Sequence, residues 1–170
     1  MLSIKQMPAD ARVWVYQSNR VLSDTEVSAV NNAGMQFVSG WKAHGANLTA
    51  GFDVVYNHFI VISIDETKVK AGGCSLDDAA HFINALEKHF NLNLLDRMAV
   101  AYRYGDEIKT CHLNNLIKEL TLAGLHTENE VGGRAGDVIV FNNMVTTKNQ
   151  FDKEWEIKLK QSWQSRVLPK

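Results

Sequence analysis

Strand-like and helix-like segments alternate along this chain, and their order constrains the fold more than any other feature of the sequence. Runs rich in β-branched and aromatic residues at 12–16, 52–56 and 59–64 predict three strands. Only Asn57 and His58 lie between the last two runs, and so short a connection predicts a β-hairpin. A segment with apolar residues at helical spacing follows the first strand, and another follows the hairpin.

The two helical segments begin with the same short pattern. Ser23 stands three residues before Glu26, and Ser75 stands three residues before Asp78. A serine followed by an acidic residue at this spacing is typical of a capping box, in which the serine is the N-cap of the helix. We therefore expect one helix over residues 24–41 and another that begins directly after Ser75.

The second half of the chain continues the alternation in shorter elements. We expect strands at 98–104, 107–110 and 137–141 and helices at 113–120 and near 148–154. The pair Gly105-Asp106 predicts a two-residue turn between the first two of these strands. An extended segment is expected after the last helix.

The predicted element order is β-α-β-β-α-β, followed by β-α-β and a tail. The first six elements match the split βαβ pattern of ferredoxin-like folds. We therefore expect an α+β fold in which helices cover one face of an antiparallel-rich sheet, with the β-α-β segment as an extension. The two prolines, Pro8 and Pro169, leave no Pro-rich linker in the interior. We expect a single domain over 1–170, with the tail 148–170 packed on the core or on a second subunit of a homodimer.

The composition is that of an ordinary globular protein, with 45% hydrophobic and 22% charged residues. The net charge of −1 favours neither nucleic acid nor an anionic membrane as a partner. No apolar run approaches the roughly 18 residues that a membrane-spanning helix needs. Residues 1–12 lack the apolar region of a secretory signal. We therefore expect a cytoplasmic protein with no membrane partner.

Neither the cysteines nor the histidines are spaced as metal ligands. Cys74 and Cys111 form no C-x-x-C pair, and the six histidines form no H-E-x-x-H motif. A disulfide framework and a Cys-rich zinc site are both disfavoured. We expect no metal and no cofactor.

The strongest candidate for a reactive site in this sequence is the stretch Gly72-Gly73-Cys74-Ser75. Two glycines allow a tight turn, and a cysteine next to a helix N-cap lies near the positive end of the helix dipole, which favours the thiolate. His44 is the candidate base and Asp65 the candidate orienting acid for a Cys74 nucleophile. The alternative is an inert thiol packed in a structural turn.

Five residues are candidate ligand contacts. Gly72, Gly73 and Ser75 would present backbone N–H groups at the start of the helix. The Arg20 guanidinium is a candidate contact for a ligand carboxylate. The Asn142 side-chain amide, at the end of the last strand, is a candidate hydrogen-bonding group for a ligand. The structural alternative is a salt bridge for Arg20 and a role in a turn for Asn142.

Four stretches stand out together: WVYQSNR at 14–20, WKAHG at 41–45, GCS at 73–75, and VFNN at 140–143 with Thr147-Lys148 shortly after it. In these stretches the chain resembles an uncharacterised bacterial protein family whose members often carry the label "ABC transporter ATPase". The resemblance spans nearly the whole chain and implies no catalytic residues. No glycine in this sequence is followed by lysine, so the phosphate-binding G-x-x-x-x-G-K-[ST] loop is absent and we do not expect ATPase activity.

Two functions from different classes remain open. The first is the binding of a small molecule or a protein partner. The second is a cysteine-dependent hydrolase or transferase, with Cys74 as nucleophile and His44 as base. A third hypothesis is self-association through the apolar residues of the tail, Trp155 to Trp163. These hypotheses differ in where they place the Cys74 thiol, the His44 imidazole and the tail.

Overall fold

The computed structural model describes residues 2–125 and 134–168, and in it the chain forms two compact units. Unit 1 contains Met1–Leu95 and Met144–Asp152. Unit 2 contains Asp96–Asn143 and Lys153–Lys170. The expectation of a single domain stays a prediction. None of the described helices is both long and apolar enough to span a membrane.

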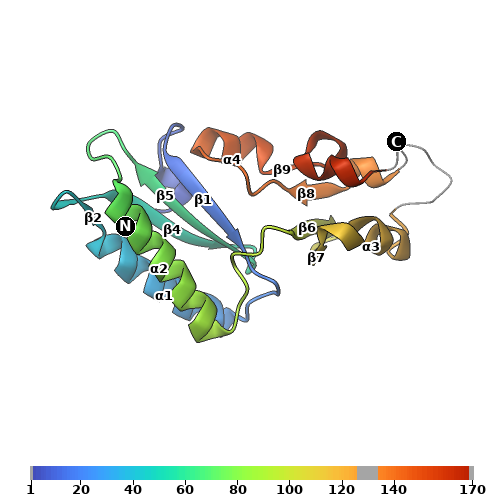
Figure 1. Ribbon diagram of the computed structural model, residues 1–170, viewed down its shortest axis with the longest axis horizontal. Coiled ribbons are helices and arrows are strands. Elements are labelled where there is room, and N and C mark those ends of the chain that lie inside the picture. The colour runs from blue at the N-terminus through green and yellow to red at the C-terminus, as the bar shows by residue number, and fades with distance from the viewer. Residues whose placement is uncertain (1, 126–133, 169–170) are drawn as a thin grey trace. The chain divides into compact units, whose positions relative to one another are not determined.

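Unit 1 is built on a three-stranded antiparallel sheet in the order β1-β5-β4 (Figure 1). The strands are β1 (Arg12–Gln17), β4 (Thr49–Val55) and β5 (Phe59–Asp65). The predicted hairpin between β4 and β5 is confirmed, and its turn places Tyr56 and Asn57 in the left-handed region with φ of 54° and 51°. The central strand β5 is buried over nearly its whole length, which fits its apolar residues Phe59–Ile62 and Ile64, and the polar Ser63 between them is buried as well.

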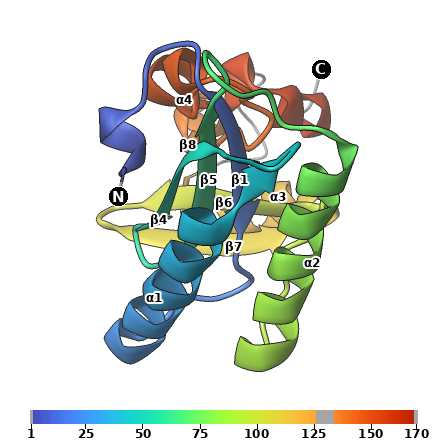
Figure 2. The same ribbon diagram turned by 90° about the vertical axis from the view of Figure 1, so that its left-hand side faces the viewer.

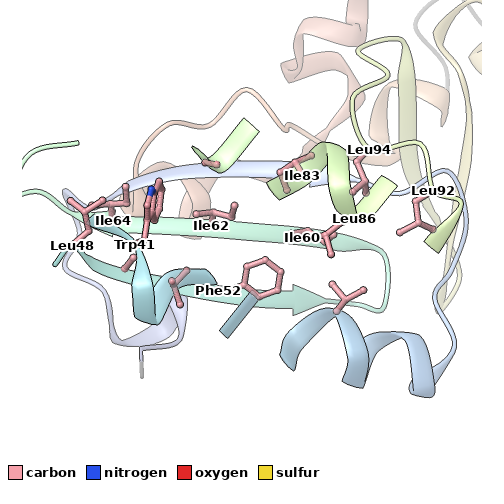
Figure 3. Close-up of a cluster of buried hydrophobic side chains, with 14 of the residues drawn as sticks. Trp41, Leu48, Phe52, Ile60, Ile62, Ile64, Ile83, Leu86, Leu92 and Leu94 are labelled. Atoms are coloured by element: carbon pink, nitrogen blue, oxygen red, sulfur yellow. The ribbon is translucent and has the colours of Figure 1, made fainter. Parts of the chain in front are cut away.

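Helices α1 (Asp24–Gly40) and α2 (Gly73–Phe90) cover one face of this sheet (Figure 2). The predicted capping box at the start of α1 is confirmed, because Ser23 and Glu26 each accept a hydrogen bond from the other's backbone N–H. The main core lies between the helices and the sheet (Figure 3). It includes Val30, Val38, Trp41, Leu48, Phe52, Ile60, Ile62, Ile64, Ile83 and Leu86.

A small hairpin connects α1 to β4 and was not predicted from the sequence. Its strands, β2 (Lys42–Ala43) and β3 (Ala46–Asn47), have two residues each. The turn between them places His44 and Gly45 at positive φ, 52° and 82°. Strands of two residues are too short to show an alternating pattern, so the sequence suggested only the end of a helix here.

The other face of the sheet is covered by the N-terminal segment and by residues that return from downstream. A 3-10 helix at Ile4–Gln6 packs there with Val13 and Val61, and Phe151 of α4 (Lys148–Glu154) joins the same cluster. The helix predicted near 148–154 is thereby confirmed. The outer edge of β1 is also occupied, because the Val13 N–H donates to the Thr146 carbonyl oxygen at 2.9 Å.

Unit 2 contains a four-stranded antiparallel sheet in the order β7-β6-β8-β9. Its elements are β6 (Ala99–Tyr104), β7 (Glu107–His112), α3 (Leu116–Leu122), β8 (Ile139–Phe141) and β9 (Glu156–Lys158). The predicted strands, the hairpin at Gly105-Asp106 and the third helix are all present. The polar, Gly-rich stretch 126–136 predicts a loop, and most of it lies outside the described residues.

The apolar residues of the tail pack inside unit 2. Leu159 is fully buried in the unit 2 core, and Trp163 packs against the same cluster. Trp155 is also buried and its indole Nε1 donates to Asn143 Oδ1 at 3.0 Å. The described tail therefore contributes to the core of its own chain, and association with a second subunit stays a prediction.

The α+β class is confirmed, while the sixth predicted element differs in its partners. In a ferredoxin-like arrangement this strand would lie next to β1, but β6 pairs with β7 and β8 in unit 2. The outer edge of β1 instead pairs with the segment around Thr146 and Thr147. Because each edge of a strand pairs with one neighbour only, this segment takes the place beside β1 that β6 would have in a ferredoxin-like arrangement.

Candidate functional site

The end of α1 and the start of α2 are joined by a buried hydrogen bond within unit 1. Trp41, the residue that follows α1, donates its indole Nε1–H to the carbonyl oxygen of Ser75 at 2.9 Å. Trp41 is 2% exposed, so the bond is shielded from water. Two stretches singled out in the sequence, 41–45 and 72–75, are therefore neighbours in space.

The first turn of α2 is arranged differently from the prediction. The N-cap is Gly72, and the predicted N-cap Ser75 lies inside the first turn of the helix. The Ser75 hydroxyl accepts a hydrogen bond from the Gly72 N–H at 2.8 Å and donates to the Gly72 carbonyl at 2.9 Å. The capping box expected from Ser75 and Asp78 is therefore wrong, because Ser75 closes the turn that begins three residues earlier.

Cys74 is exposed and lies within this first helical turn. The hypothesis of a thiol sealed among apolar side chains is thus not what the structure shows. The thiol lies one turn from Asp78 along the helix, because residues four apart share a helix face. Position and exposure both leave the sulfur accessible to a reagent from solution.

His44 lies against the start of α2. A Cβ atom built on Gly72 would be 3.2 Å from His44 Nε2, so the imidazole packs on the backbone at the N-cap. No hydrogen bond connects His44 with Cys74 or with Asp65 in residues 2–125 and 134–168. The structure thus brings the candidate base to the helix that carries the candidate nucleophile without joining the two groups.

Asp65 has a local partner of its own. Its carboxylate accepts a hydrogen bond from the Thr67 N–H at 3.0 Å, and hydrogen bonds from Thr67 lower the pKa of Asp65. The neighbouring Glu66 accepts from the Ala71 N–H at 2.9 Å and so holds the loop that leads into α2. Asp65 stabilises the end of β5, and its role as orienting acid stays a prediction.

An open hollow of about 420 Å³ lies beside this junction and was not predicted from the sequence. It is lined by Phe37, Gly40, Trp41, Lys42, Asp78 and His81. No spacing rule connects residues 37–42 with 78–81, because they belong to two different helices.

The hollow has a floor of ordered aromatic rings. The Phe37 ring stacks on Phe82 with centroids 4.4 Å apart and an interplanar angle of 3°. The Phe37 and Trp41 ring centroids are 4.9 Å apart, and Phe82 also contacts Phe52 in an edge-to-face arrangement. The indole of Trp41 is further fixed by its bond to Ser75. These contacts hold the floor in one conformation.

Arg20 lies at the opposite end of the two helices from this site. Its guanidinium binds both carboxylate oxygens of Glu26, at 2.9 and 2.6 Å, and donates to the Phe90 carbonyl at 3.0 Å. Phe90 ends α2, and a helix of 18 residues is about 27 Å long. Arg20 is therefore far from Gly72 and links the helices to each other.

Asn142 belongs to unit 2, where its backbone N–H donates to the Trp155 carbonyl at 2.6 Å. The second cysteine, Cys111, is also in unit 2, and burial raises its pKa to about 11. Across the described parts of the chain, no group of three or more His, Cys, Asp or Glu residues is placed to hold a metal ion.

Comparisons with known proteins add no family to this geometry. No family model matches the chain, and neither the curated proteins nor the solved structures give a match. The resemblance to a bacterial family stays a prediction, and the site is interpreted from its own residues.

Proposed function

We propose that unit 1 binds a small molecule in the hollow between the end of α1 and the start of α2. The observation that carries this proposal is the combination of an aromatic floor, Phe37 and Trp41, with a rim of ionisable side chains, Lys42, Asp78 and His81. Ligand sites in proteins are typically hollows of some 300–1,000 Å³ with apolar walls and a few polar groups. The volume and lining fit that description.

The structure also supports a site that is formed before a ligand arrives. The stacked rings and the Trp41–Ser75 hydrogen bond order the floor without any ligand. A Cβ at Gly40 would meet no atom within 4 Å, so nothing from the protein fills the space above this residue. A preformed site saves the cost of ordering side chains on binding.

The test fills the hollow from Gly40. This residue has no positive φ, so Gly40→Leu is compatible with the backbone, and its side chain would occupy the open space. The matched control is Ala29→Leu, which adds the same side chain to an exposed position of α1. A fragment library is screened by ¹H–¹⁵N NMR, with the Trp41 indole N–H as the reporter.

We expect fragments that shift the Trp41 indole signal in the wild type and in Ala29→Leu, and that lose at least about tenfold in affinity in Gly40→Leu. Equal unfolding midpoints for the two variants show that the fold is kept. If no fragment shifts this signal, or if Gly40→Leu binds the same fragments equally well, the proposal is wrong.

A second function is favoured by one specific contact, that of His44 with Gly72. Cys74 would attack the carbonyl carbon of an acyl donor, forming an S–C bond as the bond to the leaving group breaks. His44 would take the thiol proton and pass it to the leaving group, and water would then release the acyl group as a carboxylic acid. Catalytic hydrogen bonds often form only when the substrate is bound, so their absence here leaves this chemistry open.

Alkylation of Cys74 by iodoacetamide tests this second function. Cys111→Ser serves as the background so that Cys74 is the sole thiol. If His44 activates the thiol, His44→Ala slows alkylation at pH 7 by roughly tenfold, while His89→Ala, an exposed histidine near the far end of α2, leaves the rate unchanged. Equal rates in all three proteins would remove His44 as the base.

A further inference from the structure

The rim of the hollow carries two opposite charges from two different elements. Lys42 begins β2, directly after α1, and Asp78 lies in α2 beyond its first turn. Within residues 2–125 and 134–168, neither the Lys42 ammonium nor the Asp78 carboxylate takes part in a hydrogen bond or an ion pair. Both groups line the same hollow without binding each other. A positive and a negative group are thus available to a ligand at once.

From this arrangement we infer that the ligand is zwitterionic, with a carboxylate that binds Lys42, an ammonium that binds Asp78 and an apolar group that packs on Phe37 and Trp41. A free amino acid with a large apolar side chain has this chemistry. The inference rests on the proposed function, because it names the ligand class of the same hollow.

The same charges disfavour other ligand classes. A nucleotide or another polyanion would be repelled by Asp78, and a simple cation would be repelled by Lys42. A residue with an apolar side chain inside a peptide chain has neither a free ammonium nor a free carboxylate, so it would satisfy neither charge. A neutral apolar molecule would use the aromatic floor alone.

The aromatic floor sets the size and shape of the apolar part. Phe37 is stacked on Phe82, the Trp41 indole is fixed by Ser75, and the Phe37 and Trp41 rings are tilted by 37° to each other, so the floor is two angled aromatic faces that packing holds in place. A ring or a branched aliphatic group packs well on such a surface. Gly40 also lines the hollow and is exposed, so the hollow is open to solvent at this residue.

Three ligands that share one side chain test the inference. L-phenylalanine carries both charges, N-acetyl-L-phenylalanine lacks the ammonium, and L-phenylalaninamide lacks the carboxylate. Binding is measured by NMR titration of the wild type, Asp78→Asn and Lys42→Gln at constant salt. Asp77→Asn is the control, because it removes an exposed charge from the neighbouring position of α2 that does not line the hollow.

We expect L-phenylalanine to bind the wild type and Asp77→Asn at least about tenfold more tightly than either analogue. Asp78→Asn should remove the advantage over the N-acetyl compound alone, and Lys42→Gln should remove the advantage over the amide alone. This crossed pattern assigns each charge to its own partner, which a general loss of fold would not produce.

Failure of the ligand class can be told apart from failure of the site. Equal affinities for the three compounds, or no binding of them while other fragments remain sensitive to Gly40→Leu, overturn the zwitterion and leave the hollow as a binding site. The absence of any fragment that is sensitive to Gly40→Leu overturns both.

Discussion

Trp41 donates its indole N–H to the Ser75 carbonyl, so the residue that follows α1 is bonded to the first turn of α2. Trp41→Phe keeps an aromatic ring but leaves a buried carbonyl without this donor. We expect a loss of about 1–3 kcal/mol in the free energy of unfolding, measured by urea titration. Trp14→Phe is the control, because Trp14 is only partly buried and should cost less. Equal losses would show that the hydrogen bond contributes nothing.

A second stability prediction concerns Gly34 in α1. A Cβ at this position would lie 2.2 Å from Cδ1 of Phe52, whose ring is buried and contacts Phe82. Gly34→Ala should therefore lower the free energy of unfolding by about 1–3 kcal/mol, although alanine favours a helix by about 1 kcal/mol over glycine. Gly40→Ala in the same helix meets no atom and should be neutral or stabilising. A stable Gly34→Ala protein would contradict the close contact.

The sequence patterns at Ser23 and Ser75 show what a local pattern can predict about the start of a helix and what it cannot. Both serines precede an acidic residue by three positions, yet Ser23 alone is the N-cap of its helix. At the second site, Gly72 and Ser75 are also three residues apart and form their own pair of hydrogen bonds. The pattern therefore predicts that a helix starts nearby but not which of two overlapping turns begins it.

Elements with a regular hydrophobic pattern could be predicted from the sequence, because that pattern depends on residues that are close in the chain. Contacts between residues far apart in the chain could not be predicted in this way. The apolar period of α1 and the continuous apolar run of β5 depend on near neighbours in the chain. The edge of β1 is instead occupied by Thr146, while β6 pairs with β8, and no local pattern encodes these contacts between residues far apart in the chain. The hollow also depends on contacts between distant residues, since residues 37–42 come from the end of α1 and the start of β2, whereas residues 78–81 come from α2.

Buried His58 should make stability depend on pH. It is 1% exposed, and burial lowers its pKa to about 4 from an ordinary value of 6.5. Between these two values the unfolded chain binds a proton at His58 and the folded chain does not, so the free energy of unfolding falls as the pH falls through this window. We expect this contribution, on the order of 2–3 kcal/mol, to be missing in His58→Gln.

Urea titrations at pH 7 and pH 4.5 measure it. His89→Gln replaces an exposed histidine and should keep the wild-type difference between the two pH values. The His58 prediction is wrong if His58→Gln and the wild type lose the same stability on acidification.

The Arg20–Glu26 pair gives a prediction that is independent of unfolding. Hydrogen bonds from Arg20 and then from Ser23 lower the pKa of Glu26 to about 2. A ¹³C NMR titration of the Glu26 carboxyl group should show this low midpoint in the wild type. In Arg20→Gln the midpoint should rise toward the ordinary value but stay below it, because the Ser23 backbone N–H and hydroxyl still donate to the Glu26 carboxylate. An unchanged midpoint would contradict the ion pair.

The two cysteines should differ in reactivity. Burial, and next the charge of Glu119, raise the pKa of Cys111 to about 11, whereas Cys74 is exposed. Iodoacetamide at pH 8 should therefore add one group to the native protein, at Cys74, and a second only after unfolding in urea. Peptide mass mapping identifies the site, and an adduct at Cys111 in the native protein would contradict the structure.

Unit 1 is completed by residues that the ribosome makes late. The first segment of this unit ends at Leu95, but Thr146 at the edge of β1 and Phe151 of α4 on the sheet follow the whole segment Asp96–Asn143. During synthesis the unit 1 sheet therefore emerges with one edge and part of one face uncovered, and it stays so while most of unit 2 is being translated. For this interval the nascent chain exposes a strand edge, and a pause in translation before residue 144 would prolong that exposure.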